Sequence, residues 1–272
     1  MKGLEKIIGE IMDENGKGRP AVSAWFLYFF SILYGAVVKT IDILYRKNVF
    51  LPEKLPCKVV SIGNLCVGGT GKTPMTLYAA GLLQQMGYRV CILSRGYKGR
   101  AENSGGVVTD GKTVLMDADA AGDEPVMMAQ SLRDAPVVVG KNRVKSGKDA
   151  VTAFHPDIIL LDDGFQHRKL FRDVNILLLD YEKPFGNRRL IPRGRLREPP
   201  GAMARCDAVV FTRSKADALH DKRNLLCSPY IDVRTKPVFF ARHVPFLCKV
   251  VKTDQRIEYP EKSDSDGAGV AS

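Results

Sequence analysis

The feature that most constrains the fold of this chain is a glycine-rich segment at residues 63–73, GNLCVGGTGKT. The residues before it, 57–63, are mostly apolar and have the pattern of a short buried strand. Residues 74–88 follow it with apolar side chains at mixed three- and four-residue spacing, which predicts a helix. A strand, a glycine-rich loop and a helix in this order are the context that a Walker A phosphate-binding motif requires.

In such a loop the glycines let successive N–H groups face one phosphate group, and the following helix adds the positive partial charge of its N-terminus. We predict that a bound triphosphate is held by Gly68, Gly69, Thr70, Gly71, Lys72 and Thr73. Lys72 would reach the β- and γ-phosphates, and the Thr73 hydroxyl would ligate Mg²⁺. Cys66 stands where the motif has glycine, and we expect Gly68 and Gly69 to supply the lost flexibility. The alternative is a glycine-rich turn with a surface lysine.

Two acidic residues follow another apolar stretch, DIILL at residues 157–161. Asp162 and Asp163 would lie at the carboxyl end of this strand, where a Walker B strand places its carboxylates. They could hold Mg²⁺ directly or through water. Acidic residues after a strand are also common in ordinary turns, and this alternative stays open.

The remaining pattern predicts an α/β fold of the P-loop NTPase type. Further apolar stretches at residues 89–94, 135–139, 174–180 and 207–212 are strand candidates, with helical stretches between several of them. This alternation predicts a largely parallel sheet flanked by helices. The length of 272 residues fits one large or two small domains, and 45% hydrophobic with 26% charged residues excludes a disordered or collagen-like chain. The 6 cysteines are scattered and predict no metal–thiolate site.

The N-terminal region contains a charge-free apolar stretch at residues 20–38. As a helix it would be about 28 Å long, close to the thickness of a bilayer core. We expect an uncleaved, membrane-associated helix; a buried core helix and a helix lying in the membrane interface are the alternatives. The net charge of +11 predicts an anionic partner.

A long loop is predicted at residues 184–200, because this stretch is too rich in glycine and proline for one regular element. It carries Arg188, Arg189, Arg193, Arg195 and Arg197. Arginine binds phosphate in bidentate fashion, so the loop could clamp a phosphate group. The alternative is a solvated basic loop.

Several motifs, in this order and spacing, resemble one known family, the tetraacyldisaccharide 4'-kinases of lipid A biosynthesis. They are GNLCVGGTGKTP (63–74), SRGYKG (94–99), GDEPVMMA (122–129), GKNR (140–143), DDGFQH (162–167) and RLIPRGRLREP (189–199). DDGFQH and the LREP segment are far more specific than the phosphate loop. The apolar N-terminal helix agrees with the family as well.

The resemblance implies a kinase at the cytoplasmic face of the inner membrane. It would move the γ-phosphate of ATP, with Mg²⁺, onto the 4'-hydroxyl of an anionic acylated disaccharide lipid, a tetraacyldisaccharide 1-phosphate. By the same resemblance Asp123 acts on the attacking hydroxyl, and Arg143 and Gln166 help to orient phosphate or the metal's ligands; either could equally be a surface or packing residue. From the sequence alone Asp123 is an ordinary helix N-cap, and His167 fits a satisfied structural histidine better than a residue that supports the site's ligands.

The resemblance also implies a second, C-terminal lobe with an Asp-His-His motif whose histidine partners the catalytic aspartate. Residues 236–241 resemble the start of this lobe, but no Asp-His-His follows. We therefore expect a truncated or divergent C-terminus, reduced turnover and intact ATP binding. The expected division is an anchoring region (1–50), a kinase core (51–217), a partial lobe (218–261) and a flexible tail (262–272).

Other classes of function compete with the kinase. Ser214, Lys215, Ala216 and Asp217 lie where a guanine-selecting motif would follow a strand, which would suit a GTP-dependent switch or a metal-insertion GTPase. A partition-type ATPase would bind DNA, but the charge-free N-terminal stretch argues against it, and no nucleic-acid partner is expected. An inactive nucleotide-binding remnant is the remaining alternative.

Overall fold

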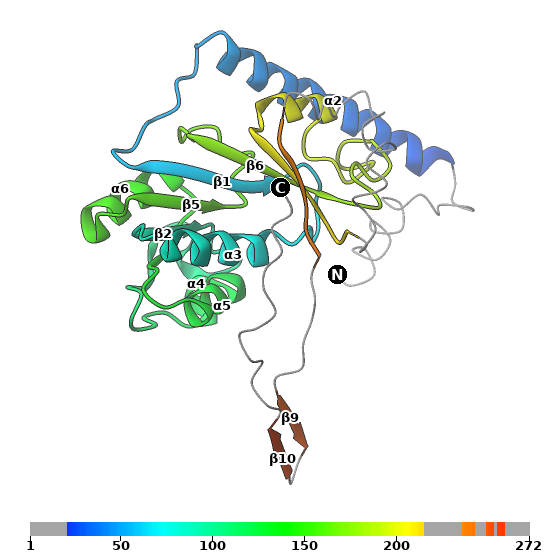
Figure 1. The fold of residues 1–272 in the computed structure, drawn as a ribbon. Coiled ribbons are helices and arrows are strands. Elements are labelled where there is room, and N and C mark those ends of the chain that lie inside the picture. The colour runs from blue at the N-terminus through cyan, green and yellow to red at the C-terminus, as the bar shows by residue number, and fades with distance from the viewer. Residues whose placement is uncertain (1–20, 215–235, 243–248, 253–254, 259–272) are drawn as a thin grey trace.

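The computed structural model describes residues 21–214, 236–242, 249–252 and 255–258. Within these residues, an 8-stranded sheet has the order β3-β4-β2-β5-β1-β6-β7-β8 (Figure 1). Its strands are β1 (Lys58–Asn64), β2 (Val90–Ser94), β3 (Gly106–Thr109), β4 (Val137–Val139), β5 (Ile158–Asp162), β6 (Val174–Asp180), β7 (Ala208–Thr212) and β8 (Val238–Phe240). All neighbouring strands are parallel except β3 and β4, which are antiparallel. The largely parallel α/β fold is therefore confirmed.

Helices cover both faces of this sheet. They are α3 (Lys72–Gln85), α4 (Ala118–Ala121), α5 (Asp123–Ser131) and α6 (Arg143–Phe154), with short 3₁₀ helices η1 (Arg100–Glu102) and η2 (Pro200–Arg205). Successive strand residues point to opposite faces. Leu160 therefore packs with Ala80 of α3 and Met128 of α5, whereas Leu161 packs with Ala150 of α6. Because both faces are covered, the central strands β2 and β5 are apolar up to their last residues, Ser94 and Asp162.

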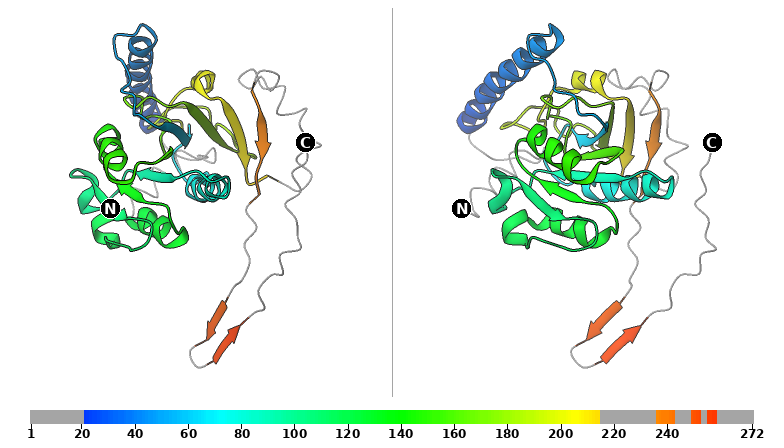
Figure 2. Two further views of the ribbon diagram at one scale, coloured as in Figure 1. Left: turned by 60° about the vertical axis from the view of Figure 1, so that its left-hand side comes forward. Right: turned by 90° about the vertical axis from the view of Figure 1, so that its left-hand side faces the viewer.

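The apolar stretches of the sequence locate most of the parallel strands. The helix after the glycine-rich loop begins at Lys72, two residues before the predicted start at Pro74. The sequence did not predict the edge strands β3 and β8, which are only 4 and 3 residues long. β8 pairs in parallel with β7, so residues 238–240 extend the main sheet. Strands β9 (Lys249–Lys252) and β10 (Gln255–Glu258) form a separate antiparallel hairpin (Figure 2).

The N-terminal helix α2 (Ala21–Arg46) runs along the outside of the molecule, beside the segment that contains η2 (Figure 1). It continues 8 residues beyond the charge-free stretch that ends at Val38. In this extension Asp42 pairs with Arg46 of the same helix at 2.8 Å, with Arg168 at 2.8 Å and with Arg205 at 3.6 Å. Its Trp25–Arg46 stretch is long and apolar enough to cross a bilayer, and only 6% of it is buried. The alternative of a buried core helix is therefore wrong.

The predicted division of the chain into four regions remains a prediction. Residues 1–20 and the tail at 262–272 lie outside the described residues, as does most of the stretch proposed as a partial lobe. Lys215, Ala216 and Asp217 of the proposed guanine-selecting motif also lie outside them.

Candidate functional site

The glycine-rich loop connects β1 to α3, as its sequence predicted. Gly68 has φ +117° and Gly71 has φ +76°, values at which a side chain would strain the backbone. Gly71 is also the N-cap residue of α3, so the loop ends directly at the helix N-terminus. Exposed N–H groups at such a terminus form an anion-binding site.

Lys72 and the two acidic residues converge beside this loop. The Lys72 Nζ lies 3.9 Å from Asp163 Oδ1. On the same helix, Thr76 Oγ1 lies 3.1 Å from Asp162 Oδ1. The carboxyl end of β5 therefore faces the first turn of α3, where Thr73 is buried. The predicted ligands of a phosphate and of a divalent cation lie within one cluster.

The two carboxyl groups differ in electrostatic environment. Burial, together with the charge of Asp163, raises the pKa of Asp162 from 3.8 to about 6. Burial acts on Asp163 in the same direction, but Arg197 donates two hydrogen bonds to its carboxylate, at 2.9 and 2.8 Å. These bonds hold the pKa of Asp163 below its usual range. A cation bound beside Asp162 would favour the ionised form of that carboxyl.

Residues predicted to orient phosphate or metal ligands surround the acids. The charge of Arg143 acts on both carboxylates, and burial lowers the pKa of its guanidinium to about 10, so it stays charged at neutral pH. Gln166 Nε2 donates to the Asn64 carbonyl at 2.8 Å. Burial, and then the charge of Arg143, lowers the pKa of His167 to about 4, so its imidazole is neutral.

Unpaired polar atoms show that this cluster fits an additional polar group. Arg143 Nε, Gln166 Oε1 and His167 Nε2 are buried and have no hydrogen-bond partner within the part of the chain that the structure describes. Buried polar atoms normally have partners, so a bound group that pairs with them would be stabilised here. The expectation of a satisfied histidine is therefore not confirmed at Nε2. Together with the loop, these atoms fit a triphosphate and a divalent cation.

Asp123 is the first residue of α5 and is exposed. Its N-cap interpretation is wrong, because Gly122 occupies the cap position with φ +90° and no side-chain cap bond is made. The SRGYKG segment packs closely against this turn, because a Cβ on Gly99 would lie only 2.6 Å from the Ala120 carbonyl oxygen. Glu124, the next residue, acts electrostatically on Asp162. Asp123 itself is exposed at the start of the same helix.

Asn64 is a site residue that the sequence did not single out, and Arg197 was predicted only as one of five arginines that could clamp a phosphate group. Asn64 is the last residue of β1, and its side chain donates to Thr70 Oγ1 of the loop at 2.6 Å. Arg197 bonds both Asp163 and the Asn64 side-chain oxygen. Both residues lie in motifs that resemble the kinase family, GNLCVGG and LREP. These motifs are the sequence signal that could have identified Asn64 and Arg197 as site residues.

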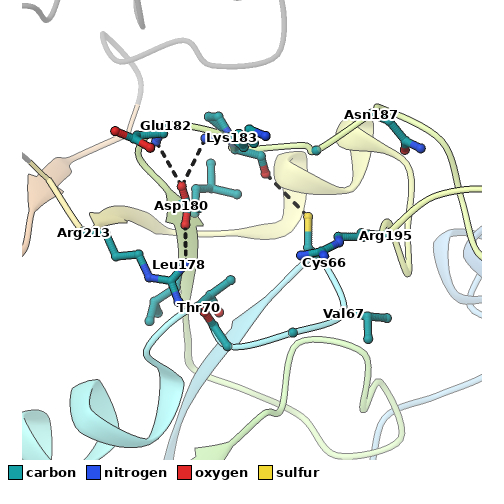
Figure 3. Close-up of a pocket in the computed structure, with 15 residues that line it drawn as sticks. Cys66, Val67, Thr70, Leu178, Asp180, Glu182, Lys183, Asn187, Arg195 and Arg213 are labelled. Atoms are coloured by element: carbon teal, nitrogen blue, oxygen red, sulfur yellow. Dashed lines mark hydrogen bonds and ion pairs between the residues drawn. The ribbon is translucent and has the colours of Figure 1, made fainter. Parts of the chain in front are cut away.

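A cavity of about 380 Å³ adjoins the first half of the loop (Figure 3). Arg213 borders it and joins two of its walls: its Nη2 donates to the Gly69 carbonyl at 2.6 Å, and its Nη1 pairs with Asp180 at 2.8 Å. Arg195 of the long loop and Lys183, just before it, line the same space. Residues 184–199 form no helix or extended strand, so the predicted irregular segment is confirmed except at Pro200, where η2 begins. The volume of this cavity is typical of small-molecule sites. Asp162 and Asp163 lie near the other end of the glycine-rich loop, where Lys72 and Arg197 both pair with Asp163.

Comparisons with known proteins agree with this geometry. Residues 23–272 match the model of the family described as tetraacyldisaccharide-1-P 4'-kinase. The tetraacyldisaccharide 4'-kinase of Syntrophus aciditrophicus is 41% identical over 237 residues, 85% of this chain and 63% of that protein. The one from Pelobacter propionicus is 48% identical over 184 residues, 68% of this chain and 51% of that protein.

A solved structure is similar as well, LpxK from Aquifex aeolicus in complex with ATP. It shares 40% identity and a TM-score of 0.66, over 78% of this chain and 62% of that one. The chain thus spans about half to two thirds of the length of these relatives. By its phosphate loop, its acidic cluster and these matches, the chain belongs to the tetraacyldisaccharide-1-P 4'-kinase family.

Proposed function

We propose that this chain transfers the γ-phosphate of ATP to the 4'-hydroxyl of a tetraacyldisaccharide 1-phosphate. The observation that carries this proposal is the convergence of Lys72, Asp162 and Asp163 beside a glycine-rich loop, in a chain of this family. The relatives are named for this activity, and the similar solved structure is a complex with ATP. A GTPase finds no comparable support.

Phosphoryl transfer depends mainly on positioning and on charge neutralisation. The backbone N–H groups of residues 68–71 would hold the β- and γ-phosphates, and Lys72 would contact them with its ammonium group. Thr73, Asp162 and Asp163 would hold Mg²⁺, and Arg143 and Gln166 would orient the phosphate or the metal's ligands. When bound, Mg²⁺ supplies charge neutralisation at the phosphate oxygens.

In this proposal Asp123 acts on the acceptor hydroxyl, a role that its carboxylate chemistry and the family resemblance support. Asp123 is exposed at the first turn of α5. It would accept the proton of the 4'-hydroxyl while the hydroxyl oxygen attacks the γ-phosphorus and ADP leaves. The dependence of this carboxylate on a histidine from an Asp-His-His motif remains a prediction, with reduced turnover as its expected consequence.

A lipid substrate requires a site at the membrane, and α2 supports this placement. Most of the buried or half-buried positions of α2 follow one stripe at three- and four-residue spacing, Leu27, Ser31, Tyr34, Val38, Asp42 and Tyr45, and Gly35 and Leu44 are the others among its described side chains. That stripe packs against the protein, whereas Trp25, Phe29, Phe30 and Leu33 are exposed. A helix that is docked along its length favours an interfacial position over a spanning one. We place the enzyme at the cytoplasmic face of the inner membrane.

The direct test is transfer of labelled γ-phosphate to the purified disaccharide lipid in detergent micelles. The native chain is expected to label the lipid, Lys72→Ala to lose nucleotide binding, and Asp123→Ala to bind ATP without transfer. A parallel titration compares ATP with GTP. A folded native chain that binds ATP and never labels the lipid would favour the inactive remnant, and a preference for GTP would contradict the kinase.

A further inference from the structure

One segment of the long loop pairs directly with the start of the phosphate loop. We refer to residues 189–197 as the strap. The Arg197 N–H donates to the Leu65 carbonyl at 2.7 Å, and the Val67 N–H donates to the Arg195 carbonyl, also at 2.7 Å. Cys66 and Leu196 thus form an antiparallel bridge. The strap therefore fixes the backbone that leads from β1 into the glycines.

Helix α2 holds the opposite side of the strap at both of its ends. Near the first end, Ser31 Oγ donates to the Leu190 carbonyl at 2.9 Å. At the other end, the Tyr34 hydroxyl donates to the Arg197 carbonyl at 2.8 Å. The approach is close, because a Cβ on Gly35 would lie 2.9 Å from Leu190 Cδ1. The strap is thus held between α2 and the phosphate loop.

Arg197 is the point where these contacts meet. Its carbonyl accepts from Tyr34, its N–H donates to Leu65, and its guanidinium pairs with Asp163. A shift of its backbone would therefore move the entrance of the phosphate loop and the partner of an acidic site residue together. A short hydrogen-bonded path connects an exposed apolar helix to the nucleotide site.

We propose that Tyr34 of helix α2 is a positioning residue for the nucleotide site, acting through the Arg197 backbone on the phosphate loop. The proposal rests on the proposed function, in which this loop binds the phosphates of ATP. It assigns α2 a role in nucleotide binding in addition to membrane association. Helix α2 and the phosphate loop would then move together.

The hydroxyl of Tyr34 can be removed without undocking the helix. Asp42, two turns further along α2, stays paired with Arg168 and Arg205. Tyr28 offers a matched control on the same helix. Its ring lies under the Arg189 guanidinium at 5.1 Å, and its hydroxyl makes no hydrogen bond with the described residues, so Tyr28→Phe keeps its contact.

The experiment compares the full native chain with Tyr34→Phe and Tyr28→Phe in detergent micelles. MgATP affinity is measured by titration with a fluorescent ATP analogue, and amide hydrogen exchange is followed in peptides that cover residues 64–70 and 195–198. We expect Tyr34→Phe to bind about three- to tenfold more weakly, the range of one lost hydrogen bond. Exchange at Val67 and Arg197 should be faster, and the melting temperature should fall by no more than about 2–4 °C, the effect of one lost hydrogen bond on a folded protein of this size. Tyr28→Phe should match the native chain in every measurement.

Unchanged affinity and exchange in Tyr34→Phe would overturn the proposal, and so would equal losses in both tyrosine variants. Ser31→Ala provides a second variant, with faster exchange around the strap expected, in case Tyr34→Phe is poorly folded. A native chain that binds no MgATP would contradict the proposed function instead. In that case the exchange comparison still decides whether Tyr34 positions the loop.

Discussion

Replacing Asp162 with asparagine should stabilise the protein and at the same time impair its cation site. Asp162 is almost fully buried, and burial with the nearby Asp163 charge raises its pKa from 3.8 to about 6. A shift of this size costs about 3 kcal/mol when the carboxyl ionises, at 1.36 kcal/mol for each pH unit. Asparagine is nearly the same size, carries no charge and can still accept a hydrogen bond from Thr76.

The sign of the pH dependence follows from the raised pKa. Below pH 3.8 the carboxyl is protonated in both folded and unfolded states, so native and Asp162→Asn proteins should be similarly stable. Between pH 3.8 and 6 the unfolded state loses this proton first, and the native protein loses stability relative to the variant. Above pH 6 the full difference remains. Accommodating the new amide offsets part of this difference. Above pH 6 we therefore expect Asp162→Asn to be more stable than the native protein by about 1–3 kcal/mol, or roughly 3–10 °C in melting temperature.

The assay is thermal unfolding from pH 4 to pH 8 without nucleotide or Mg²⁺, followed by repetition with both. Asp163→Asn is the control, because it removes the carboxylate that pairs with Arg197 and should lower the melting temperature. With MgATP the native protein should gain more stability than Asp162→Asn, since binding to the folded state stabilises it. Equal melting temperatures of native and Asp162→Asn proteins across this pH range would refute the electrostatic reasoning.

Three further substitutions test how the site is supported. Gly99→Ala would place a Cβ 2.6 Å from the Ala120 carbonyl oxygen, so it should lower the free energy of unfolding by about 1–3 kcal/mol. It should also slow phosphate transfer more than it weakens ATP binding, and equal losses in both assays would contradict this. Gly63→Ala would place a Cβ 2.7 Å from Phe165 Cβ and push the phosphate-loop strand from the acidic motif, with a similar loss in chemical unfolding; an unchanged midpoint would contradict it. Arg213→Gln frees the loop carbonyl that it holds and should weaken nucleotide binding about two- to fivefold with stability almost unchanged, whereas a large drop in melting temperature would indicate a structural role instead.

Local sequence patterns were sufficient to predict the phosphate loop and the central strands. Short apolar runs between turn residues define buried parallel strands, and a carboxylate pair after such a run falls at the edge where ligands bind. The glycines at 68 and 71 are visible in the sequence for the same reason that they are needed, since only glycine takes those φ values without strain. These features depend on neighbours in the chain.

Features that depend on tertiary contacts could not be predicted in this way. The long loop has several arginines of equal chemistry, and only the pairing of the strap with residues 65–67 determines that Arg197 is the one that reaches Asp163. Two of the three arginines that pair with Asp42, Arg168 and Arg205, lie on distant segments, so the docking of the last turns of α2 was not visible in the local sequence. Asp123 was assigned to a cap that Gly122 occupies, because the left-handed turn there is imposed by packing against residues 96–99.

The arrangement of charges around Asp163 explains how Lys72 can serve a phosphate. Lys72 Nζ lies 3.9 Å from Asp163, a loose ion pair, whereas Arg197 holds the same carboxylate with two bonds of 2.8 and 2.9 Å. When the ammonium group turns to a phosphate, the carboxylate keeps its stronger partner, and no buried charge is left unpaired. Lysine suits this part because its flexible stem carries a compact charge, whereas the planar guanidinium of arginine suits the fixed partner. The cost of releasing Lys72 is therefore small, and the strap that carries Arg197 belongs to the nucleotide site even if it touches no phosphate.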